Sequence, residues 1–386
     1  MINTVDQQGA GGSATASSVR LPLRPELADE EPYGAPQLDV PVLLNVNENP
    51  YPPSEDVVAT IAEDVARAAR GMNRYPDRDA TVLRQDLADY LTLETGVRLD
   101  DKDVWAANGS NEVMLHVLQA FGGPGRTALS FAPTYSMYPE YARDTNTAWV
   151  TGRRSEDFTL DQSKALAAIS RHRPSVVLLA SPNNPTGTAL PIQLVEAVAA
   201  RTSAMGAVLV VDEAYAEFRR AGTPSAVTLL PSYPNLAVAR TTSKAFALAG
   251  ARVGYLAASK QLVDALRIVR LPYHLSAVTQ AVARAALRHS DELLGRVEQL
   301  RTERDETVDW LRAQGLRAVD SDANFVLFGT FADRHAVWQS LLDDGVLIRE
   351  TGPAGWLRVS IGTGTEMAAF RASLERVLKT DVGRQT

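Results

Sequence analysis

Short apolar runs alternate with amphipathic segments of helix length from Val104 to about Leu256. This alternation is typical of a sheet with helices on both faces, so we predict an α/β fold. Residues 175–180 and 207–211 are apolar and rich in β-branched side chains, as expected for strands buried on both sides. Further strand candidates are residues 127–131, 235–239 and 252–257. Because ligands in such folds bind at the carboxyl ends of the strands, we expect the functional groups in the loops there.

A second patterned region begins near Ser290. Apolar residues recur at helical spacing through residues 291–313, which predicts one long charged helix. The pattern beyond it predicts three strands and one helix, at residues 324–328, 346–348 and 357–361 and at residues 338–342. These elements would form a second, smaller α/β domain.

We predict four parts along the chain. Residues 1–18 are small and polar and should form a flexible tail. Residues 19–53, proline-rich from Pro32 onward, should form an extended arm that lies over another surface. The large cofactor-binding domain should span residues 54–288, and the small C-terminal domain residues 289–386.

The composition argues against several classes of protein. Hydrophobic residues make up 45% and charged residues 22% of the 386 residues, which is ordinary for a soluble globular protein. A net charge of −7 without a long basic run argues against nucleic-acid binding. No segment approaches the ~20 apolar residues of a membrane span, and the start of the chain does not fit a secretory signal. Since cysteine is absent, disulfides and thiol chemistry are ruled out, and we expect a cytoplasmic protein without a metal site.

One segment combines a lysine with hydroxyls and an arginine. Lys244 follows Thr241, Thr242 and Ser243, and Arg252 comes eight positions later. A lysine amine can form a Schiff base with an aldehyde cofactor, while hydroxyls and a guanidinium can hold its phosphate. A Ser-Lys pair by itself is more often a solvated surface. The complete segment nevertheless suggests a site for pyridoxal phosphate (PLP).

Two loops supply further candidates. Ser110 or Asn111, which follow Gly109, can cap a helix whose start would bind phosphate, although a plain capped helix is the alternative. Residues 181–187 directly follow a predicted strand, and their prolines and glycine favour a tight loop. Asn184 in that loop can donate a hydrogen bond to a ring oxygen.

Three candidates concern the cofactor ring directly. Asp212 ends the strand at residues 207–211 and could stay ionised against a protonated pyridine nitrogen; a metal ligand or a helix-capping acid are the alternatives. Tyr215 could donate to the phenolic oxygen of the ring. Tyr135 follows the strand at residues 127–131 and could lay its ring on a flat heteroaromatic, although aromatic residues near sheets more often belong to the core.

Two arginines near the end of the chain suggest an anion site. Arg358 lies in the apolar strand at residues 357–361, where a guanidinium is costly unless it is paired or meets an anion. It is therefore a candidate substrate clamp, with a structural ion pair as the alternative. Arg349 closes the strand at residues 346–348.

Together these motifs resemble the fold-type I PLP enzymes, class II aminotransferases, and specifically the histidinol-phosphate aminotransferase family. The resemblance extends from about Arg20 to Leu378. The segments that carry it are residues 44–50 (LNVNENP), 74–77 (RYPD), 181–187 (SPNNPTG), 212–215 (DEAY) and 243–254 (SKAFALAGARVG). It implies a large domain with a mostly parallel seven-stranded sheet, a smaller α/β C-terminal domain, and a homodimer with shared active sites.

The resemblance also implies a role for each site residue. Lys244 would be the Schiff-base lysine and proton carrier, and Asp212 the partner of the pyridine nitrogen. The other ring contacts would be Asn184, Tyr215 and the stacked Tyr135. The phosphate would meet Gly109, Ser110, Asn111, Thr241, Ser243 and Arg252, with Tyr75 from the other subunit. The substrate pocket would consist of Arg358, Arg349, Tyr33 and Asn47.

The implied reaction is amino transfer between L-histidinol phosphate plus 2-oxoglutarate and imidazole acetol phosphate plus L-glutamate, a step of histidine biosynthesis. Two other activities stay open: an aromatic amino-acid aminotransferase, or a PLP-dependent lyase such as an amino-acid phosphate decarboxylase. A PLP-binding protein without activity and an α/β binding protein without PLP are the remaining alternatives.

Overall fold

The computed structural model describes residues 21–383 of the chain. Its internal contacts divide the chain between Gly34 and Ala35 into two parts. The described residues of the first part contain one short 3-10 helix, η1 (Pro25–Leu27). The tail predicted at residues 1–18 lies outside the described residues, and the elements below all belong to the second part.

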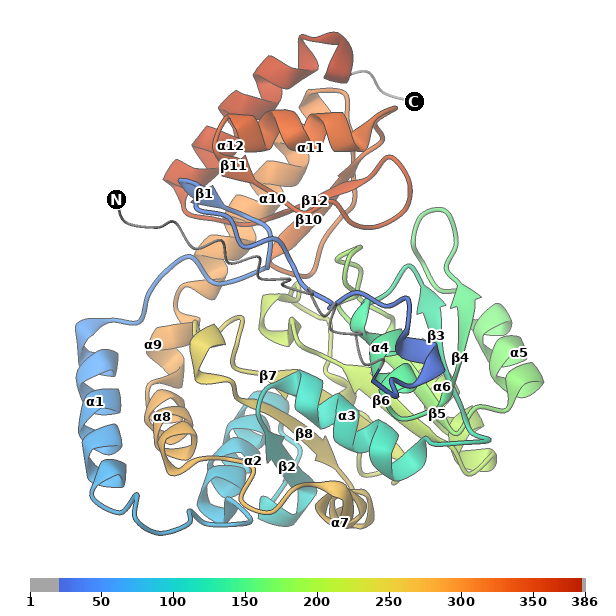
Figure 1. Ribbon diagram of the computed structural model, residues 1–386, viewed down its shortest axis with the longest axis vertical. Coiled ribbons are helices and arrows are strands. Elements are labelled where there is room, and N and C mark those ends of the chain that lie inside the picture. Colours follow the sequence, from blue (N-terminus) through green and yellow to red (C-terminus); the bar gives the residue numbers. More distant parts are fainter. Residues whose placement is uncertain (1–20, 384–386) are drawn as a thin grey trace, which may run out of the picture. The chain divides into compact units, whose positions relative to one another are not determined.

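A sheet of seven strands forms the centre of the second part (Figure 1). The strands lie in the order β2-β8-β7-β6-β5-β3-β4. Within this sheet β8 runs antiparallel to its two neighbours, while the other neighbours from β7 to β4 pair in parallel. The strands are β2 (Val104–Ala107), β3 (Thr127–Ala132), β4 (Ala148–Arg153), β5 (Val176–Ala180), β6 (Val208–Asp212), β7 (Leu236–Thr241) and β8 (Gly254–Ala258). The mostly parallel seven-stranded sheet is confirmed, although β2 and β4 are not among the individually predicted strands.

Helices cover both faces of this sheet, because successive residues of a strand point to opposite sides. On β6, Leu209 and Val211 pack into a core with α2, α5, α6 and α8, whereas Val208 and Val210 pack into a core with α3, α4 and α7. These helices are α2 (Thr81–Thr95), α3 (Ser110–Phe121), α4 (Met137–Asp144), α5 (Gln162–His172), α6 (Ile192–Ala204), α7 (Lys260–Val269) and α8 (Ala277–Arg288). Burial of β5 and β6 on both faces explains their apolar, β-branched composition.

The remaining elements of this region lie around the sheet. Helix α1 (Glu55–Ala69) packs along α8. The 3-10 helices are η2 (Asp101–Asp103), η3 (Ala216–Phe218), η4 (Ala226–Leu229) and η5 (Ala249–Ala251). Among residues 21–383, no helix combines the length and the hydrophobicity needed to span a bilayer.

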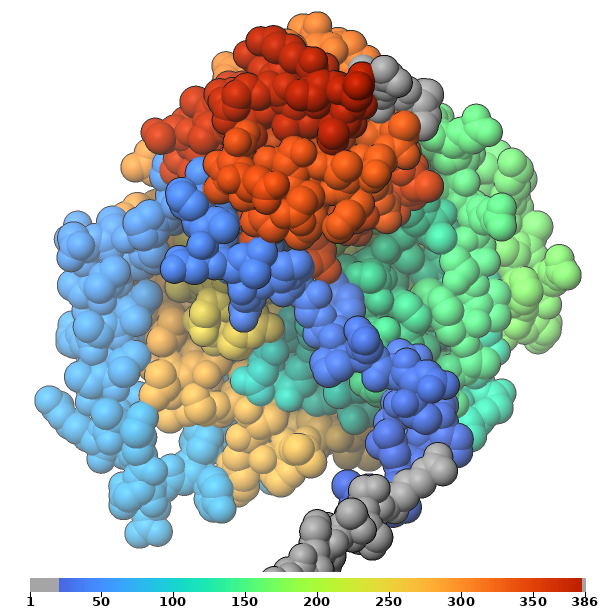
Figure 2. Space-filling view, turned by 45° about the horizontal axis from the view of Figure 1, so that its top comes forward, coloured from blue at the N-terminus to red at the C-terminus, as the bar shows by residue number. Residues whose placement is uncertain are grey.

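The C-terminal elements form a smaller α/β assembly, seen in orange to red in Figure 2. Its three-stranded antiparallel sheet has the order β12-β10-β9. The elements are α9 (Ser290–Leu294), α10 (Val297–Ala313), β9 (Arg317–Ala318), β10 (Phe325–Gly329), α11 (Arg334–Asp343), β11 (Val346–Leu347), β12 (Leu357–Ser360), α12 (Gly364–Leu378) and η6 (Asp381–Gly383). The strands predicted in this region are all present, with ends shifted by one or two residues.

The single helix predicted at residues 291–313 is wrong, because the chain forms two helices, α9 and α10, with Gly295 between them. Glycine ends a helix easily, since ordering its backbone costs more entropy than for other residues. The helix predicted at residues 338–342 starts earlier than expected. The Asp333 side chain caps α11 by accepting a hydrogen bond from the backbone N–H of Ala336.

Residues 42–49 pass from the C-terminal elements toward the large sheet. Strand β1 (Val42–Leu43) pairs in parallel with β11. The backbone N–H of Leu44 then donates to the carbonyl of Leu347, and Leu44 accepts from the N–H of Ser360. This pairing brings the residues after β1 to the site described next.

Candidate active site

The loops at the ends of the large sheet collect polar side chains at one edge. Asp212 is the last residue of β6, and Thr241 is the last residue of β7. Asn184 lies shortly after β5. Strand β8 runs in the opposite direction, so Arg252, which precedes it, comes to the same edge. These strands therefore bring together four of the residues singled out by the sequence.

Lys244 is held near β7 with its amine in a largely buried position. Its Nζ donates to the carbonyl oxygen of Val46 at 2.9 Å. Burial lowers the pKa of Lys244 to about 8, and the positive charge of Arg358 acts in the same direction, while the carboxylate of Glu48 opposes both. Roughly a tenth of this amine is therefore neutral at pH 7 and about half at pH 8, and the neutral form is the one that a nucleophile or a proton acceptor requires.

Asp212 is a buried carboxylate with neutral hydrogen-bond donors. Its Oδ2 accepts from the hydroxyl of Tyr138 at 2.9 Å, and its Oδ1 accepts from the backbone N–H of Ala214 at 3.1 Å. Burial raises the pKa of Asp212 to about 6, although both hydrogen bonds act to lower it. A cation placed against this carboxylate would favour its ionised form, as a protonated ring nitrogen would.

The contact from Tyr138 is a part of the site that the sequence interpretation missed. Tyr138 is fully buried in α4, and its ring packs edge-on against that of Tyr135 at 5.6 Å between centroids. The hydroxyl of Tyr135 in turn donates to Oδ1 of Asn111 at 3.4 Å. The spacing of Tyr135 and Tyr138, three residues apart at the start of a helix, was the available signal, because such residues lie on one face.

The start of α3 forms a cradle with Arg252. Gly109 has a positive φ of 83°, and a Cβ built on it would lie 2.5 Å from Nη2 of Arg252, so glycine is required for this close approach. Arg252 donates from Nη1 to the hydroxyl of Ser243 at 3.4 Å, and Thr241 donates to the same hydroxyl at 3.0 Å. A guanidinium, two hydroxyls and the free N–H groups of a helix start are the donors that bind phosphate. This donor set fits the phosphate of PLP.

The prediction that Ser110 or Asn111 caps α3 is wrong. Gly109 occupies the N-cap position without a side-chain hydrogen bond, and Ser110 and Asn111 already belong to the first turn. The backbone N–H of Asn108 donates instead to the carboxylate of Glu112 at 2.6 Å. The absence of a side-chain cap leaves the first N–H groups of α3 available for an anion.

Arg358 is a buried cation with hydrogen bonds to two other segments of the chain. Its side chain donates to Oδ1 of Asn184 and to the carbonyl of Asn45, both at 2.7 Å. The guanidinium also lies over the ring of Phe325 at 5.1 Å from the centroid. The positive charge of Arg358 acts to lower the pKa of Lys244. The anion clamp and the structural ion pair both stay open as predictions.

Asn47 and Tyr215 contact each other beside these groups. Nδ2 of Asn47 donates to the hydroxyl of Tyr215 at 2.9 Å. The backbone N–H of Asn47 donates to the hydroxyl of Ser360, which donates back to the Asn47 side chain, both at 2.9 Å. Asn324 also donates to the carbonyl of Asn47 at 3.1 Å. The residues after β1 are thus fixed to β12 and to the loop after β6.

Three predicted residues lie apart from these contacts. Arg349 forms a backbone bridge with Arg358, with N–H···O distances of 3.0 and 2.9 Å. Tyr75 is 79% exposed, and its ring stacks on that of Tyr273 at 4.4 Å. Tyr33 belongs to the first part of the chain, so its place relative to the site is not determined. Its side chain is 47% exposed.

The chain matches the family model described as aminotransferase class I and II over residues 40–376. It is 64% identical to histidinol-phosphate aminotransferase 3 of Burkholderia lata, over 93% of this chain and 96% of that protein. It is 63% identical to the histidinol-phosphate aminotransferase of Thermobifida fusca, over 92% of this chain and 95% of that protein. The solved histidinol-phosphate aminotransferase of Sinorhizobium meliloti, in complex with pyridoxal-5'-phosphate, is similar with a TM-score of 0.76 and 25% identity, covering 88% of this chain and 91% of that one.

Proposed function

Because the chain belongs to the class I and II aminotransferase family, we propose that it transfers the amino group of L-histidinol phosphate to 2-oxoglutarate. The products would be imidazole acetol phosphate and L-glutamate, in a step of histidine biosynthesis. The observation that carries the proposal is a second buried cation, Arg358, close enough to Lys244 to lower its pKa. We assign Arg252 to the phosphate of the cofactor, and Arg358 to the phosphate of one substrate and a carboxylate of the other.

The enzyme is a PLP-dependent transaminase. PLP supplies an aldehyde that exchanges amino groups and a ring that accepts the electron pair released at the substrate carbon. Lys244 would hold the aldehyde end covalently and then carry the proton between the substrate and cofactor carbons. An amine must be neutral to accept that proton, which the lowered pKa of Lys244 supports.

Other residues would hold and orient the cofactor. Asp212 would face the ring nitrogen and keep it protonated, since a carboxylate favours a neighbouring positive charge. Its hydrogen bonds to Tyr138 and Ala214 support a fixed carboxylate orientation. The ring oxygen and ring face would contact Asn184, Tyr215 and Tyr135. The phosphate would bind Gly109, Ser110, Asn111, Thr241, Ser243 and Arg252.

For the substrate, Arg358 would bind the phosphate of histidinol phosphate, which lacks the carboxylate of an amino acid. Arg349 is backbone-paired with Arg358 and would assist it. Asn47, held by Tyr215 and Ser360, would line the same pocket. For Tyr33, in the first part of the chain, a substrate role stays a prediction from the resemblance.

We also propose a homodimer with shared active sites. Tyr75 and Tyr273 stack on each other beside other exposed apolar side chains of the same two segments. The exposed fractions are 55% for Met72, 83% for Ile268 and 76% for Leu271. A second copy of the chain would cover this surface, and Tyr75 would contact the cofactor phosphate of the partner's site.

A direct comparison of amino donors tests the activity. Purified enzyme loaded with PLP receives histidinol phosphate, phenylalanine or tyrosine, each with 2-oxoglutarate, and the formation of glutamate is measured. We expect the highest kcat/KM with histidinol phosphate. A higher value with phenylalanine or tyrosine would contradict the proposed substrate, and release of carbon dioxide without glutamate would indicate a decarboxylase.

Arg358→Gln should raise KM for histidinol phosphate about 10- to 100-fold, because a charge-assisted contact is lost.

A further inference from the structure

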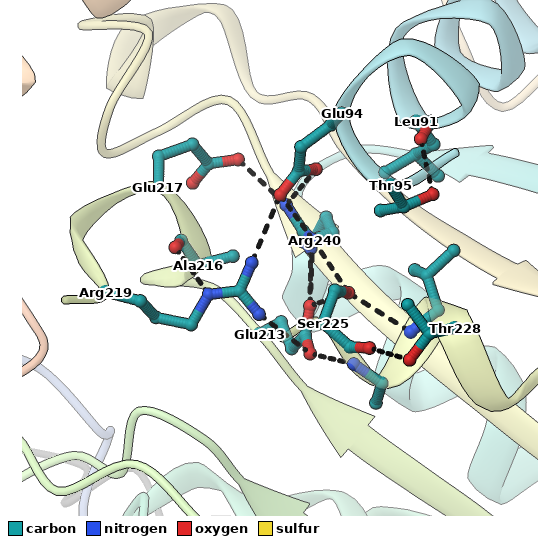
Figure 3. A network of polar contacts seen from close by, with 12 residues as sticks. Leu91, Glu94, Thr95, Glu213, Ala216, Glu217, Arg219, Ser225, Thr228 and Arg240 are labelled. Carbon is teal, nitrogen blue, oxygen red and sulfur yellow. Dashed lines mark hydrogen bonds and ion pairs between the residues drawn. The ribbon is translucent and has the colours of Figure 1, made fainter. Parts of the chain in front are cut away.

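A second charged cluster lies at the ends of β6 and β7, and Figure 3 shows its members. Its members come from α2, from the ends of β6 and β7 and from the loop between those strands. We define the Arg240 cluster as Glu94, Glu213, Glu217, Arg219, Ser225 and Arg240. Neither the motifs of the sequence nor the proposed reaction assigns a role to these residues.

Arg240 is the centre of this cluster. It lies next to the last residue of β7, and its side chain is 0% exposed. Its Nε donates to Oε2 of Glu213 at 2.9 Å, and its Nη1 donates to Oε1 of Glu217 at 3.1 Å. Its Nη2 donates to the carboxylate of Glu94 at 3.2 Å and to the hydroxyl of Ser225 at 3.1 Å. Every nitrogen of this guanidinium therefore has an acceptor.

Glu213 connects the other members to β6. It directly follows Asp212, and its carboxylate accepts from the hydroxyl of Ser225 and from the backbone N–H of Ala226, both at 2.7 Å. Its own backbone N–H donates to the carbonyl of Ala239 on β7 at 2.8 Å. Burial acts to raise the pKa of Glu213, but the charges of Arg240 and Arg219 outweigh it and hold the pKa below its usual range. Glu213 is thus an ionised partner of Arg240.

The alternation of strand residues separates this cluster from the active site. On β7, Leu236 and Val238 pack into one core, whereas Ala237 and Ala239 pack into the core on the other face. By the same alternation Arg240 points to the first face and Thr241 to the second. Glu213 and Asp212 differ in the same way at the end of β6. One face of two adjacent strand ends therefore carries an ion pair, and the other carries Asp212 and the residues leading to Lys244.

We propose that the Glu213–Arg240 ion pair is a positioning device that fixes the ends of β6 and β7 side by side and thereby sets the placement of Asp212 relative to Lys244. Asp212 and Lys244 would hold opposite sides of the same cofactor ring, so a shift between these strand ends changes both contacts at once. This inference rests on the proposed function in one respect, namely the assignment of those two residues to PLP. Glu213 and Arg240 do not touch the cofactor and act through their neighbours.

The experiment compares three variants of the full-length protein. Glu213→Gln keeps the shape of the side chain and removes the ionic partner of Arg240, and Arg240→Lys keeps the charge but loses the forked donor geometry. Glu217→Gln is the matched control: it also touches Arg240, but from η3 rather than from a strand end. Burial raises the pKa of Glu217, and the charge of Arg240 acts in the opposite direction.

The readouts are chosen to separate positioning from general stability. They are the Kd of the apoprotein for PLP, the pH midpoint of the absorbance change of the lysine-bound cofactor, kcat and KM for the amino donor, and the melting temperature. For Glu213→Gln and Arg240→Lys we expect a Kd for PLP raised about tenfold, a displaced pH midpoint, and kcat lowered about tenfold with KM changed much less. Glu217→Gln should match the wild type in all of these except melting temperature.

One result would contradict the proposed positioning role. If Glu213→Gln lowers the melting temperature but leaves the Kd for PLP, the pH midpoint and kcat at wild-type values, the pair only stabilises the fold and the inference is wrong. If Arg240→Lys does not fold, the measurements on Glu213→Gln alone test the inference. Failure of the proposed function gives a different result, because wild-type protein would then bind PLP without using histidinol phosphate, and the binding and pH measurements would still test the ion pair.

Discussion

Two groups of buried charges lie on opposite faces of the same strand ends, and they differ in their partners. In the Arg240 cluster, guanidinium groups meet carboxylates directly, with Arg240 and Glu213 joined at 2.9 Å. In the candidate active site, Lys244 donates to a backbone carbonyl, and Asp212 accepts from a hydroxyl and an amide. In the first arrangement the opposite charges outweigh the effect of burial on the pKa values of Arg240 and Glu213, whereas in the second burial prevails at both Lys244 and Asp212.

The pKa values show the consequence of this difference. The carboxylates around Arg240 raise its pKa well above the usual value even though burial acts to lower it. Burial instead lowers the pKa of Lys244 to about 8 and raises that of Asp212 to about 6. A group that must give and take protons needs a pKa close to the working pH. Within residues 21–383, the hydrogen bonds described for these two groups go to neutral partners, and burial sets the direction of both pKa shifts.

The largest expected effect comes from removing the amine. Lys244→Ala should lower the rate of amino transfer by at least about 10⁴-fold, since both the covalent link and the proton carrier are lost. The apoprotein should stay folded, because the lost hydrogen bond joins the amine to a single carbonyl. Glutamate formation and a melting curve check the two statements. Lys260→Ala, at an exposed lysine of α7, is the control and should keep full activity. Turnover by Lys244→Ala at the rate of this control would refute the assignment.

The second prediction concerns the free energy of unfolding, which should depend more on Arg240 than on Lys244. Arg240→Ala should lower the free energy of unfolding by about 3–5 kcal/mol, because Glu213 and Glu217 are left buried without their main cationic partner. Lys244→Ala should lower it little or raise it. Denaturant unfolding of both apoproteins measures the difference. A larger destabilisation by Lys244→Ala than by Arg240→Ala would show that the Arg240 cluster is not the more important of the two for stability.

The sequence predicts one of these clusters well and the other not at all. Lys244, Asp212 and Arg252 lie in short motifs next to strand ends, so the known geometry of parallel sheets brings them together. Arg240 and Glu213 occupy the adjacent positions in the same segments, but Glu94, which also accepts from Arg240, lies more than a hundred residues away on α2. Such a pairing depends on tertiary packing, which no local pattern records.

The elements of the fold also differ in how well the sequence predicts them. The pattern of apolar residues marks β5 and β6 because they are buried on both faces. It misses β4, whose residues are partly exposed and alternate irregularly. It also misses the break at Gly295, because apolar residues continue at helical spacing on both sides of that glycine. Periodicity reports which face is buried and not whether the backbone between two turns is continuous.

The third prediction concerns the pH dependence of the apoprotein. The pKa of Asp212 is raised from 3.8 to about 6, so the stability it contributes is complete below pH 3.8 and is lost as the pH rises through 6. The pKa of Lys244 is lowered from 10.5 to about 8, so the unfolded chain binds more protons between these values and stability rises with pH there. Each shift corresponds to at most about 3 kcal/mol. From these two groups, the apoprotein should be least stable between pH 6 and pH 8.

Two variants isolate these contributions from those of other titrating groups. The free energy of unfolding of Asp212→Asn, relative to the wild type, should rise between pH 4 and pH 7, because the wild type loses stability there. That of Lys244→Met, relative to the wild type, should fall between pH 8 and pH 10.5, because the wild type gains stability there. Urea unfolding of PLP-free protein at each pH gives the two differences. A constant difference across either pH range would mean that the pKa of the corresponding group is not shifted in the folded protein.

The smallest expected effect tests whether the active site needs a second chain. Tyr75 is 79% exposed and stacks on Tyr273, so Tyr75→Phe should leave the stability of the subunit unchanged. Loss of one hydroxyl contact to the cofactor phosphate should weaken PLP binding about 10- to 100-fold, since hydrogen bonds to charged groups contribute about 1.5–3 kcal/mol. Mixed dimers of Tyr75→Phe and Lys244→Ala chains supply the decisive control. One of their two sites would then carry both wild-type residues and should bind PLP with wild-type affinity, whereas two weakened or inactive sites would show that Tyr75 serves its own chain.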